Sequence, residues 1–462
     1  MFERLCFQGE RFTLPSRDNA RQKIPANAFL CPMKYRYAHL CDGFAYFALE
    51  PFIHLAFRAF FRQVHLHNHR AVEANKPVIV ASNHPTAFVD PLLMCEYLEP
   101  PIYNMTRGDI FQKPFFRKLM ESSNMFPVFR RRDGYTGRDR NEEVFDWCVE
   151  KLRRGQALVI YVEGEHHLEK RVRPIQKGIA RIAFGAYTQH RQHELQIVPA
   201  GCNYQYGDRP REEAMLNMGA PIFVRDYWED YQKNPAATIN RLCADIERAL
   251  KTVCFHLDST EDDALGEQLL TLHRNDLPQP LLPVVNFESQ RFAREKAVLD
   301  TLNVLPAPEK AALRERADHY FSTLQKEGLK DEALVKPGRG HWTWLFFLFA
   351  GLLPAMAGWL SSWPIRALTY WVADTKVKKR EFYGSVVLGV SFLSGLFYYL
   401  VWLLVGAIGW GWQGAFCALS LPVLGWFSIL YLEVWERWRA ARQAWKHSER
   451  AVLLQMRATV RG

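Results

Sequence analysis

The residues best suited to do chemistry are a histidine and an aspartate six positions apart, His84 and Asp90. A carboxylate beside a histidine fixes the tautomer of the ring and stabilises the imidazolium that forms when the ring takes a proton. The pair could therefore act as a general base on a hydroxyl group. Asp90 precedes Pro91 and also suits a helix N-cap, with proline at the first helical position. The two roles are compatible, because a cap fixes the position of the carboxylate.

The elements around this pair indicate an α/β domain. We expect a buried strand at residues 77–81, just before the pair, and a short helix at 91–98, just after it. Further strands are expected at 157–162 and 195–200, with helical patterns between them. This alternation favours a largely parallel sheet flanked by helices, which we place at residues 71–257.

Four motifs follow one another in this domain. They are residues 83–90 (NHPTAFVD), 124–130 (NMFPVFR), 161–167 (YVEGEHH) and 197–199 (IVP). The set resembles the glycerolipid acyltransferases, which include the lysophosphatidate acyltransferases. The spacing from His84 to Asp90 is one residue longer than is usual in that family and resembles a bacterial branch of it. The resemblance covers roughly residues 78–255 and implies transfer of an acyl group from a thioester to a glycerolipid hydroxyl.

The resemblance also implies roles for single residues. His84 and Asp90 would be catalytic, with direct attack by the acceptor and no acyl-enzyme. Substrate-binding roles fall on these motif or near-motif positions: Asn83, Arg130, Glu163, Gly164, Arg173 and Lys177. Arg130 would hold a phosphate on the acceptor; the alternative for residues 130–132 is a solvated turn that touches anionic lipid headgroups. The third motif has His166 where the family has arginine, so Arg173 is expected to supply the missing charge. Lys177 is either a second phosphate contact or a surface charge.

No metal or cofactor is expected beyond acyl-CoA or acyl carrier protein as co-substrate. The alternating His65, His67 and His69 have no cysteine or acidic partner at a suitable sequence spacing. Nine scattered cysteines without a Cys-x-x-Cys pair argue against a disulfide framework.

Two long stretches carry no charged residue, 342–363 and 382–432. The second has room for two transmembrane helices joined by a turn at 410–414. The first, assigned to 341–363, is expected to be re-entrant or transmembrane, with a bend at 351–354. The alternative, a buried helix pair, would normally carry a polar stripe.

The net charge of +10 supports this membrane assignment, because most of the positive excess lies after residue 340. A basic loop at 364–381 and a basic tail at 433–462 should both stay cytoplasmic. Together with the resemblance, this predicts a bacterial inner-membrane protein whose catalytic domain lies on the cytoplasmic side. A re-entrant first segment keeps both basic stretches on that side.

Two further parts complete the chain. Residues 1–70 form an N-terminal segment in which 40–61 are predicted to be a pair of amphipathic interfacial helices, the second starting at Pro51. A helix facing the core of the α/β domain is the alternative. Residues 258–340 are predicted to be a helical connector.

These features predict a membrane-bound O-acyltransferase of phospholipid biosynthesis. The acceptor would be lysophosphatidate or glycerol 3-phosphate, and the partners are membrane lipids and the acyl donor. One alternative is a lyso-aminolipid or another acceptor without phosphate, which the altered third motif suggests. Another is a non-catalytic membrane scaffold on a degenerate acyltransferase domain. Nucleic-acid binding has no motif support.

Overall fold

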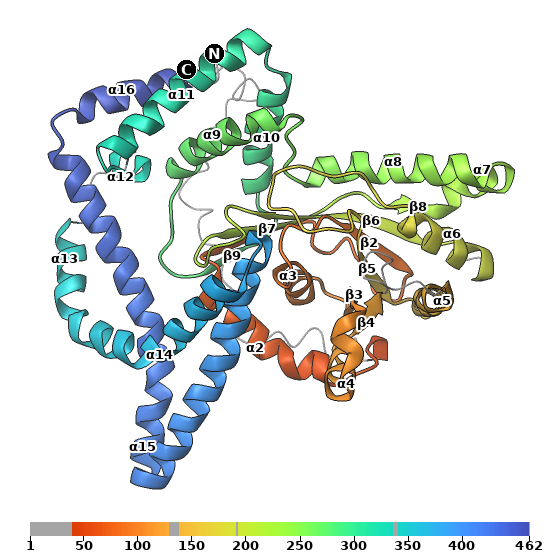
Figure 1. The fold of residues 1–462 in the computed structure, drawn as a ribbon, viewed down its shortest axis with the longest axis horizontal. Coiled ribbons are helices and arrows are strands. Elements are labelled where there is room, and N and C mark those ends of the chain that lie inside the picture. Colours follow the sequence, from red (N-terminus) through yellow and green to blue (C-terminus); the bar gives the residue numbers. More distant parts are fainter. Residues whose placement is uncertain (1–38, 129–137, 191–192, 336–340, 462) are drawn as a thin grey trace, which may run out of the picture.

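A computed structural model describes residues 39–128, 138–190, 193–335 and 341–461. Its centre is a nine-stranded sheet in the order β4-β3-β5-β2-β6-β7-β1-β9, with β8 paired to β6 (Figure 1). The strands are β1 (Gln63–His67), β2 (Val78–Ser82), β3 (Ile102–Arg107), β4 (Met125–Val128), β5 (Ala157–Tyr161), β6 (Gln196–Tyr204), β7 (Glu213–Met218), β8 (Ile222–Phe223) and β9 (Val284–Asn286). Among the described strands, only the pairings of β6 with β7 and β8 are antiparallel. The predicted α/β fold with a largely parallel sheet is confirmed.

The sheet extends beyond the predicted range of 71–257 at both ends. β1 lies before it and β9 after it, and the two pair in parallel, with Val64 opposite Val285. The expected N-terminal segment and connector therefore each contribute a strand to the core.

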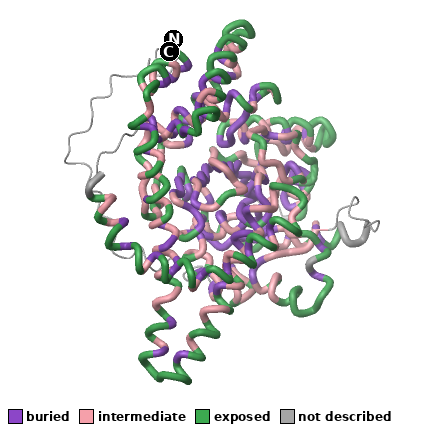
Figure 2. The backbone as a smooth tube through the Cα atoms, turned by 60° about the vertical axis from the view of Figure 1, so that its left-hand side comes forward, coloured by how far each residue is buried: buried purple, intermediate pink, exposed green. Residues whose placement is uncertain are grey.

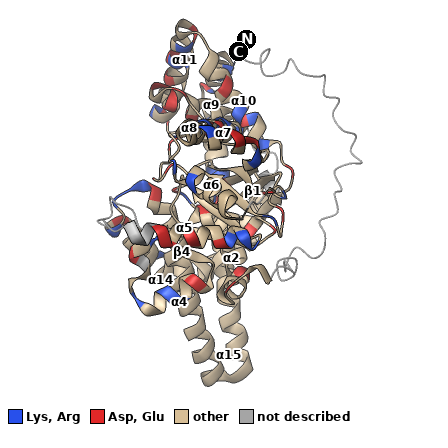
Figure 3. Ribbon diagram, turned by 90° about the vertical axis from the view of Figure 1, so that its right-hand side faces the viewer, with Lys and Arg blue, Asp and Glu red and all other residues tan. Residues whose placement is uncertain are grey.

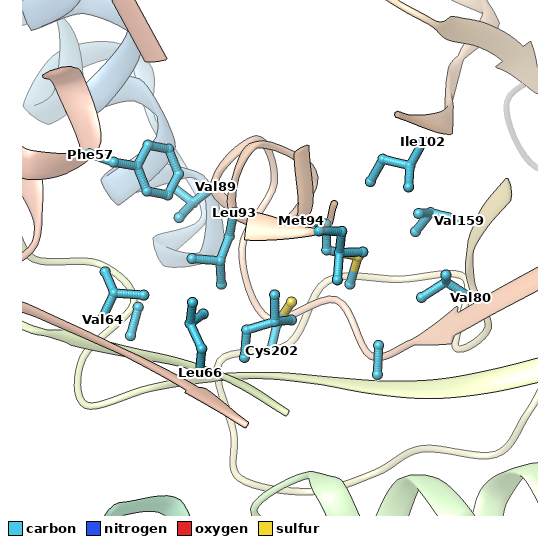
Figure 4. Close-up of a cluster of buried hydrophobic side chains, with 14 of the residues drawn as sticks. Phe57, Val64, Leu66, Val80, Val89, Leu93, Met94, Ile102, Val159 and Cys202 are labelled. Atoms are coloured by element: carbon cyan, nitrogen blue, oxygen red, sulfur yellow. The ribbon is translucent and has the colours of Figure 1, made fainter. Parts of the chain in front are cut away.

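Helices cover both faces of the sheet. On one face α2 (Ala45–Phe60) and α3 (Val89–Tyr97) enclose an apolar cluster with Val64, Leu66 and Cys202 (Figure 4). On the other face α5 (Arg138–Arg153), α6 (Gly178–His190) and α8 (Pro235–Val253) bury a second cluster. The short helices α4 (Pro114–Ser122) and α7 (Trp228–Lys233) lie at the margins. Strand β2, at the centre, is buried along its whole length, which explains the unbroken apolar run of residues 78–81 before Ser82.

The predicted pair of helices at 40–61 is wrong, because α2 is one helix that runs through Pro51. Buried Phe47 on one side of the proline and Phe57 on the other both pack inward, so tertiary contacts hold the two halves in line. The outer side exposes Phe52 and Leu55. The helix thus faces the core on one side and remains apolar on the other.

A third cluster joins the connector to the C-terminus. It contains residues of α9 (Asp263–Asn275), α10 (Arg291–Val304), α11 (Ala307–Lys326), α12 (Asp331–Val335) and α16 (Arg450–Arg461). Buried Arg457 donates to Asp331 over 2.7 Å. Residues 433–461 are therefore not a free tail: they are the end of α15 and the packed helix α16.

The remaining helices form a hairpin and a bent pair. α13 (His341–Ala350) and α14 (Leu352–Lys376) meet at a 55° bend around Gly351. The predicted basic loop at 364–381 is largely helix, because α14 continues through Pro364. α15 (Tyr383–Lys446) reverses direction at Trp410 and at Gly411, whose φ of 62° favours glycine. Its two arms project from the body as a hairpin (Figure 1).

The far half of this hairpin is largely exposed and carries no charged residue (Figures 2 and 3). Its exposed side chains include Leu393, Phe397, Leu400, Val405, Ile408, Trp410, Trp412 and Phe416. Within the described residues, Arg380–Lys446 is long and apolar enough to cross a membrane, and α13 with α14 passes the same test if counted as one broken span.

Candidate active site

The loop that carries the candidate base leaves β2 in the middle of the sheet, between β5 and β6. Asn83 fixes its first residue to β6: its amide nitrogen donates to the Cys202 carbonyl (2.9 Å), and its side-chain oxygen accepts from the Cys202 N–H (2.8 Å). Asn83, predicted to bind substrate, therefore uses both ends of its amide to position the loop.

His84 and Asp90 are brought together by the turn between β2 and α3. His84 Nδ1 lies 2.7 Å from Asp90 Oδ2, and Asp90 is fully buried. The carboxylate also accepts from the Thr86 N–H (2.9 Å), the Thr86 hydroxyl (2.8 Å) and the Tyr204 hydroxyl (2.6 Å). Four hydrogen bonds thus hold one carboxylate in one orientation. The predicted N-cap role is wrong, because α3 begins at Val89 and Asp90 lies in its first turn.

Aromatic rings hold His84 from the sides. Tyr161 stacks on it with ring centroids 3.7 Å apart, and His166 meets it edge-on at 4.0 Å. His166 in turn contacts the Phe382 ring at 5.0 Å. Because Nδ1 of His84 faces a carboxylate, that nitrogen carries the proton in the neutral ring, and Nε2 is left to act as a base.

A pocket of about 180 Å³ opens beside His84. Its walls include Asn83, Glu163, the stretch 167–171 and the stretch 202–208. Two cations belong to this lining, and both have acidic partners: Lys170 pairs with Glu267, and Arg171 lies 2.8 Å from Asp263.

Glu163 and Gly164 follow β5, and Glu163 lines this pocket. Burial raises the pKa of Glu163 to about 7, although its Oε1 accepts a hydrogen bond from the Arg173 N–H (3.2 Å). Gly164 has a φ of 76°, a conformation that other residues rarely adopt. The Arg173 guanidinium pairs with Glu169.

The predicted site residues divide into three groups. Asn83, His84 and Glu163 line one pocket, with Asp90 directly behind His84. Gly164 and Arg173 adjoin it, whereas Lys177 is exposed ahead of α6 and is not part of the lining. Arg130 lies outside the described residues.

Thr86, Tyr161 and Tyr204 are partners of the His–Asp pair that were not predicted from the sequence. Thr86 lies within the first motif and could have been suspected from its place. Tyr204 is at the carboxyl end of β6, next to β2, and only the strand order shows that it reaches Asp90. Among the described residues no group of three or more His, Cys, Asp or Glu could hold a metal ion.

Comparison with known proteins gives the chemistry a context. The Acyltransferase family model matches residues 63–203. Glycerol-3-phosphate O-acyltransferase 2 of Saccharomyces cerevisiae is 30% identical over 210 residues, which cover 44% of this chain and 27% of the yeast protein. Glycerol-3-phosphate O-acyltransferase 1 of the same yeast is 25% identical over 150 residues, 31% of this chain and 20% of that protein. The chain therefore spans about a quarter of the length of these relatives.

A solved structure is also similar, though distantly. The crystal structure of the 1-acyl-sn-glycerophosphate acyltransferase of Thermotoga maritima aligns with 43% of this chain and 78% of its own, at 15% identity and a TM-score of 0.30. The family match includes Asn83, His84 and Glu163 of the pocket lining, together with Asp90. Residues 63–203 therefore match the Acyltransferase family model, and the chain is similar in sequence to the yeast glycerol-3-phosphate O-acyltransferases.

Proposed function

We propose that the protein is a membrane-bound O-acyltransferase that moves a fatty acyl group from acyl-CoA or acyl carrier protein to a glycerolipid hydroxyl. One observation carries the proposal: the acyltransferase-family segment holds a buried His84–Asp90 pair that opens on a pocket. The hydrogen-bonded His84–Asp90 pair also argues against a non-catalytic scaffold, because a scaffold has no need of a base beside a pocket.

The chemistry needs one base and no covalent intermediate. Nε2 of His84 takes the proton of the acceptor hydroxyl as its oxygen attacks the thioester carbonyl. Asp90 stabilises the imidazolium that results. The C–O bond forms, the C–S bond breaks, and the proton on His84 passes to the leaving thiolate.

The test is acyl transfer by the purified full-length chain in lipid nanodiscs with a labelled donor. We expect His84→Ala to lower kcat by about 10²–10⁴-fold, the usual contribution of a general base. His319→Ala, on the exposed surface of α11, is the matched control and should keep full activity. Full activity of His84→Ala would exclude the mechanism.

The proposed acceptor is glycerol 3-phosphate or lysophosphatidate. The yeast relatives, which are glycerol-3-phosphate O-acyltransferases, favour the first, and the motif set favours the second. Arg130 is the proposed phosphate ligand, and Arg173 is proposed to supply the charge that the third motif lacks. In the assay, Arg130→Ala should raise the KM for phosphorylated acceptors and leave the KM for the acyl donor unchanged.

A second candidate is an acceptor without phosphate, such as a lyso-aminolipid. It is favoured by the pocket, whose cations Lys170 and Arg171 are already paired with acids. Presenting all three acceptors side by side separates the candidates, because the true acceptor should show the highest kcat/KM.

For membrane placement we propose that the α15 hairpin crosses twice while α13 and α14 form a re-entrant segment. Support comes from α11 and α16, which lie on opposite sides of these helices in sequence yet pack together; Arg316 donates to the Thr459 carbonyl over 2.9 Å. α11 and α16 must then lie on the same face of the membrane, which requires an even number of crossings between them. A full crossing by α13 and α14, added to the two crossings of the hairpin, would make the number odd. The basic side chains around the helices favour the cytoplasmic face. α2, with Phe52 against Phe392 of α15, would lie in the interface.

A further inference from the structure

The hairpin does more than project from the body, because its first residues contact the candidate active site. We define the hairpin root as residues 380–385, where the chain enters α15. The Phe88 N–H donates to Ser385 Oγ over 2.8 Å, and the Ala87 N–H donates to the Glu381 carbonyl over 3.4 Å. Three successive backbone N–H groups of the base-bearing loop are thus occupied: Asp90 accepts from Thr86, and the hairpin root accepts from the next two.

The hairpin root also packs on the opposite wall of the pocket. At Gly384 a Cβ atom would lie 2.3 Å from the Gly207 carbonyl oxygen, so only glycine allows this approach. Arg380 pairs with Asp208 over 3.2 Å. Gly207 and Asp208 line the pocket and follow Tyr204, which holds Asp90.

A third contact reaches the base through aromatic rings. Phe382 meets the His166 ring edge-on, and His166 meets His84 in the same way. The hairpin root therefore touches three separate segments of the site: the loop after His84, the third motif, and the loop after Tyr204.

We propose that the hairpin root is a structural component of the catalytic centre, with Ser385 as a positioning residue that holds the His84 loop against Asp90. This rests on the proposed acyl transfer and adds to it. The hairpin root packs directly against the loop that carries His84. Acyl transfer therefore depends on the contacts between the hairpin root and this loop. Ser385 does not contact substrate; it acts through the backbone of Phe88.

Matched serine variants test the proposal in the full-length protein. Ser385→Ala removes the acceptor for the Phe88 N–H, and we expect kcat to fall about 10-fold, a typical effect of one lost hydrogen bond. The KM for the acyl donor should change less than twofold, because the pocket walls stay in place. Ser391→Ala is the control, since Ser391 donates only to carbonyls of its own helix, and it should keep wild-type kcat.

Matched glycine variants test the packing. Gly384→Val should push the hairpin root off Gly207 and lower kcat by more than 100-fold, whereas Gly389→Val should be active, because a Cβ atom there meets nothing within 4 Å. Thermal unfolding of both variants is measured alongside; if Gly384→Val fails to fold, the serine pair alone decides.

The outcomes are distinguishable from failure of the proposed function. If the wild-type protein transfers no acyl group to any acceptor, the proposed function fails. If the wild type is active and both serine variants keep the wild-type kcat, the proposed positioning role of the hairpin root is wrong. An equal fall in kcat for both serine variants would likewise overturn it, because the effect would then not be specific to the loop contact.

Discussion

Asp90 is the most constrained side chain of the candidate site. It is fully buried, yet it accepts hydrogen bonds from His84, Thr86 and Tyr204. A carboxylate without such donors would be costly to bury as an ion. The hydrogen bonds thus offset the desolvation of the charge and aim it at His84.

Removing one of these donors should weaken activity without removing it. For Tyr204→Phe we expect a loss of about 1–2 kcal/mol of stability and about a 10-fold lower kcat, since a hydrogen bond to a charged group is lost. Tyr227→Phe is the control, because the Tyr227 hydroxyl donates to Asp245 over 2.7 Å, far from the pocket. It should lose stability but keep its kcat in the labelled-donor assay. Equal kcat for the two variants would contradict a specific role of Tyr204.

Glu163 makes stability depend on pH. Burial raises its pKa to about 7 from 4.5, so between these values the folded chain binds more protons at this site than the unfolded chain. Stability contributed by this residue therefore falls as pH rises through that window. The free energy of unfolding of the wild type should therefore fall, relative to that of Glu163→Gln, by on the order of 2–3 kcal/mol from pH 5 to pH 8.

Thermal unfolding of both proteins at these two pH values measures the difference. Glu212, whose pKa burial also raises to about 7, is present in both proteins and cancels. Unfolding temperatures that shift in parallel would show that Glu163 does not titrate in this window.

The sequence predicts those site residues that lie near one another along the chain. His84 and Asp90 were identified because six residues separate them, and Glu163 and Gly164 because they share one motif. Tyr204 and Ser385 reach the same site from 114 and 297 residues beyond their partners. Their contacts with the site arise from the strand order and from the place where α15 joins the body, which no local spacing predicts.

Prolines show how tertiary contacts decide element boundaries. Pro51, Pro364 and Pro422 all lie within helices, although an interior proline costs roughly 3 kcal/mol. We expected breaks at Pro51 and ahead of Pro364. Helix residues on both sides of each proline are buried, and these contacts outweigh the local cost. The bend between α13 and α14 lies at Gly351 instead.

The close crossing of α14 over the second arm of α15 requires a glycine, Gly358, at the contact. A Cβ atom at Gly358 would lie 1.9 Å from the Leu424 carbonyl oxygen. Gly358→Val should therefore separate the two helices and cost about 1–3 kcal/mol or more by overpacking. Gly395→Val, where the nearest atom is 3.9 Å away, should cost much less. Thermal unfolding in detergent compares them, and equal losses would contradict the close crossing.

At the scale of the molecule, the body encloses three apolar clusters and the hairpin extends from it. The parallel sheet could be predicted because its strands alternate with helices along the chain. Its edge could not: β9 has three residues and pairs with β1 more than two hundred positions away. A strand that short carries too little pattern to be recognised in sequence.

The proposed topology predicts which surfaces share one side of the membrane. In sealed vesicles with the body outward, a membrane-impermeant maleimide should label Glu315→Cys on α11 and Ser448→Cys before α16 equally. Trp412→Cys, at the hairpin tip, should react only after detergent is added. The wild-type chain measures the background from native cysteines. Protection of Ser448→Cys alone would mean an odd number of crossings between these positions.

Cys202, whose backbone anchors Asn83, gives the site one more property. Cys202 lines the pocket beside His84, where a thioester donor would bind. A thiolate at this position could take the acyl group by thioester exchange. The side chain is fully buried, and burial raises the pKa of the thiol well above its usual range. A neutral thiol is a poor nucleophile, so the enzyme should not acylate itself. Intact mass after incubation with donor alone should stay unchanged, which would exclude the protein itself as a destination of the acyl chain.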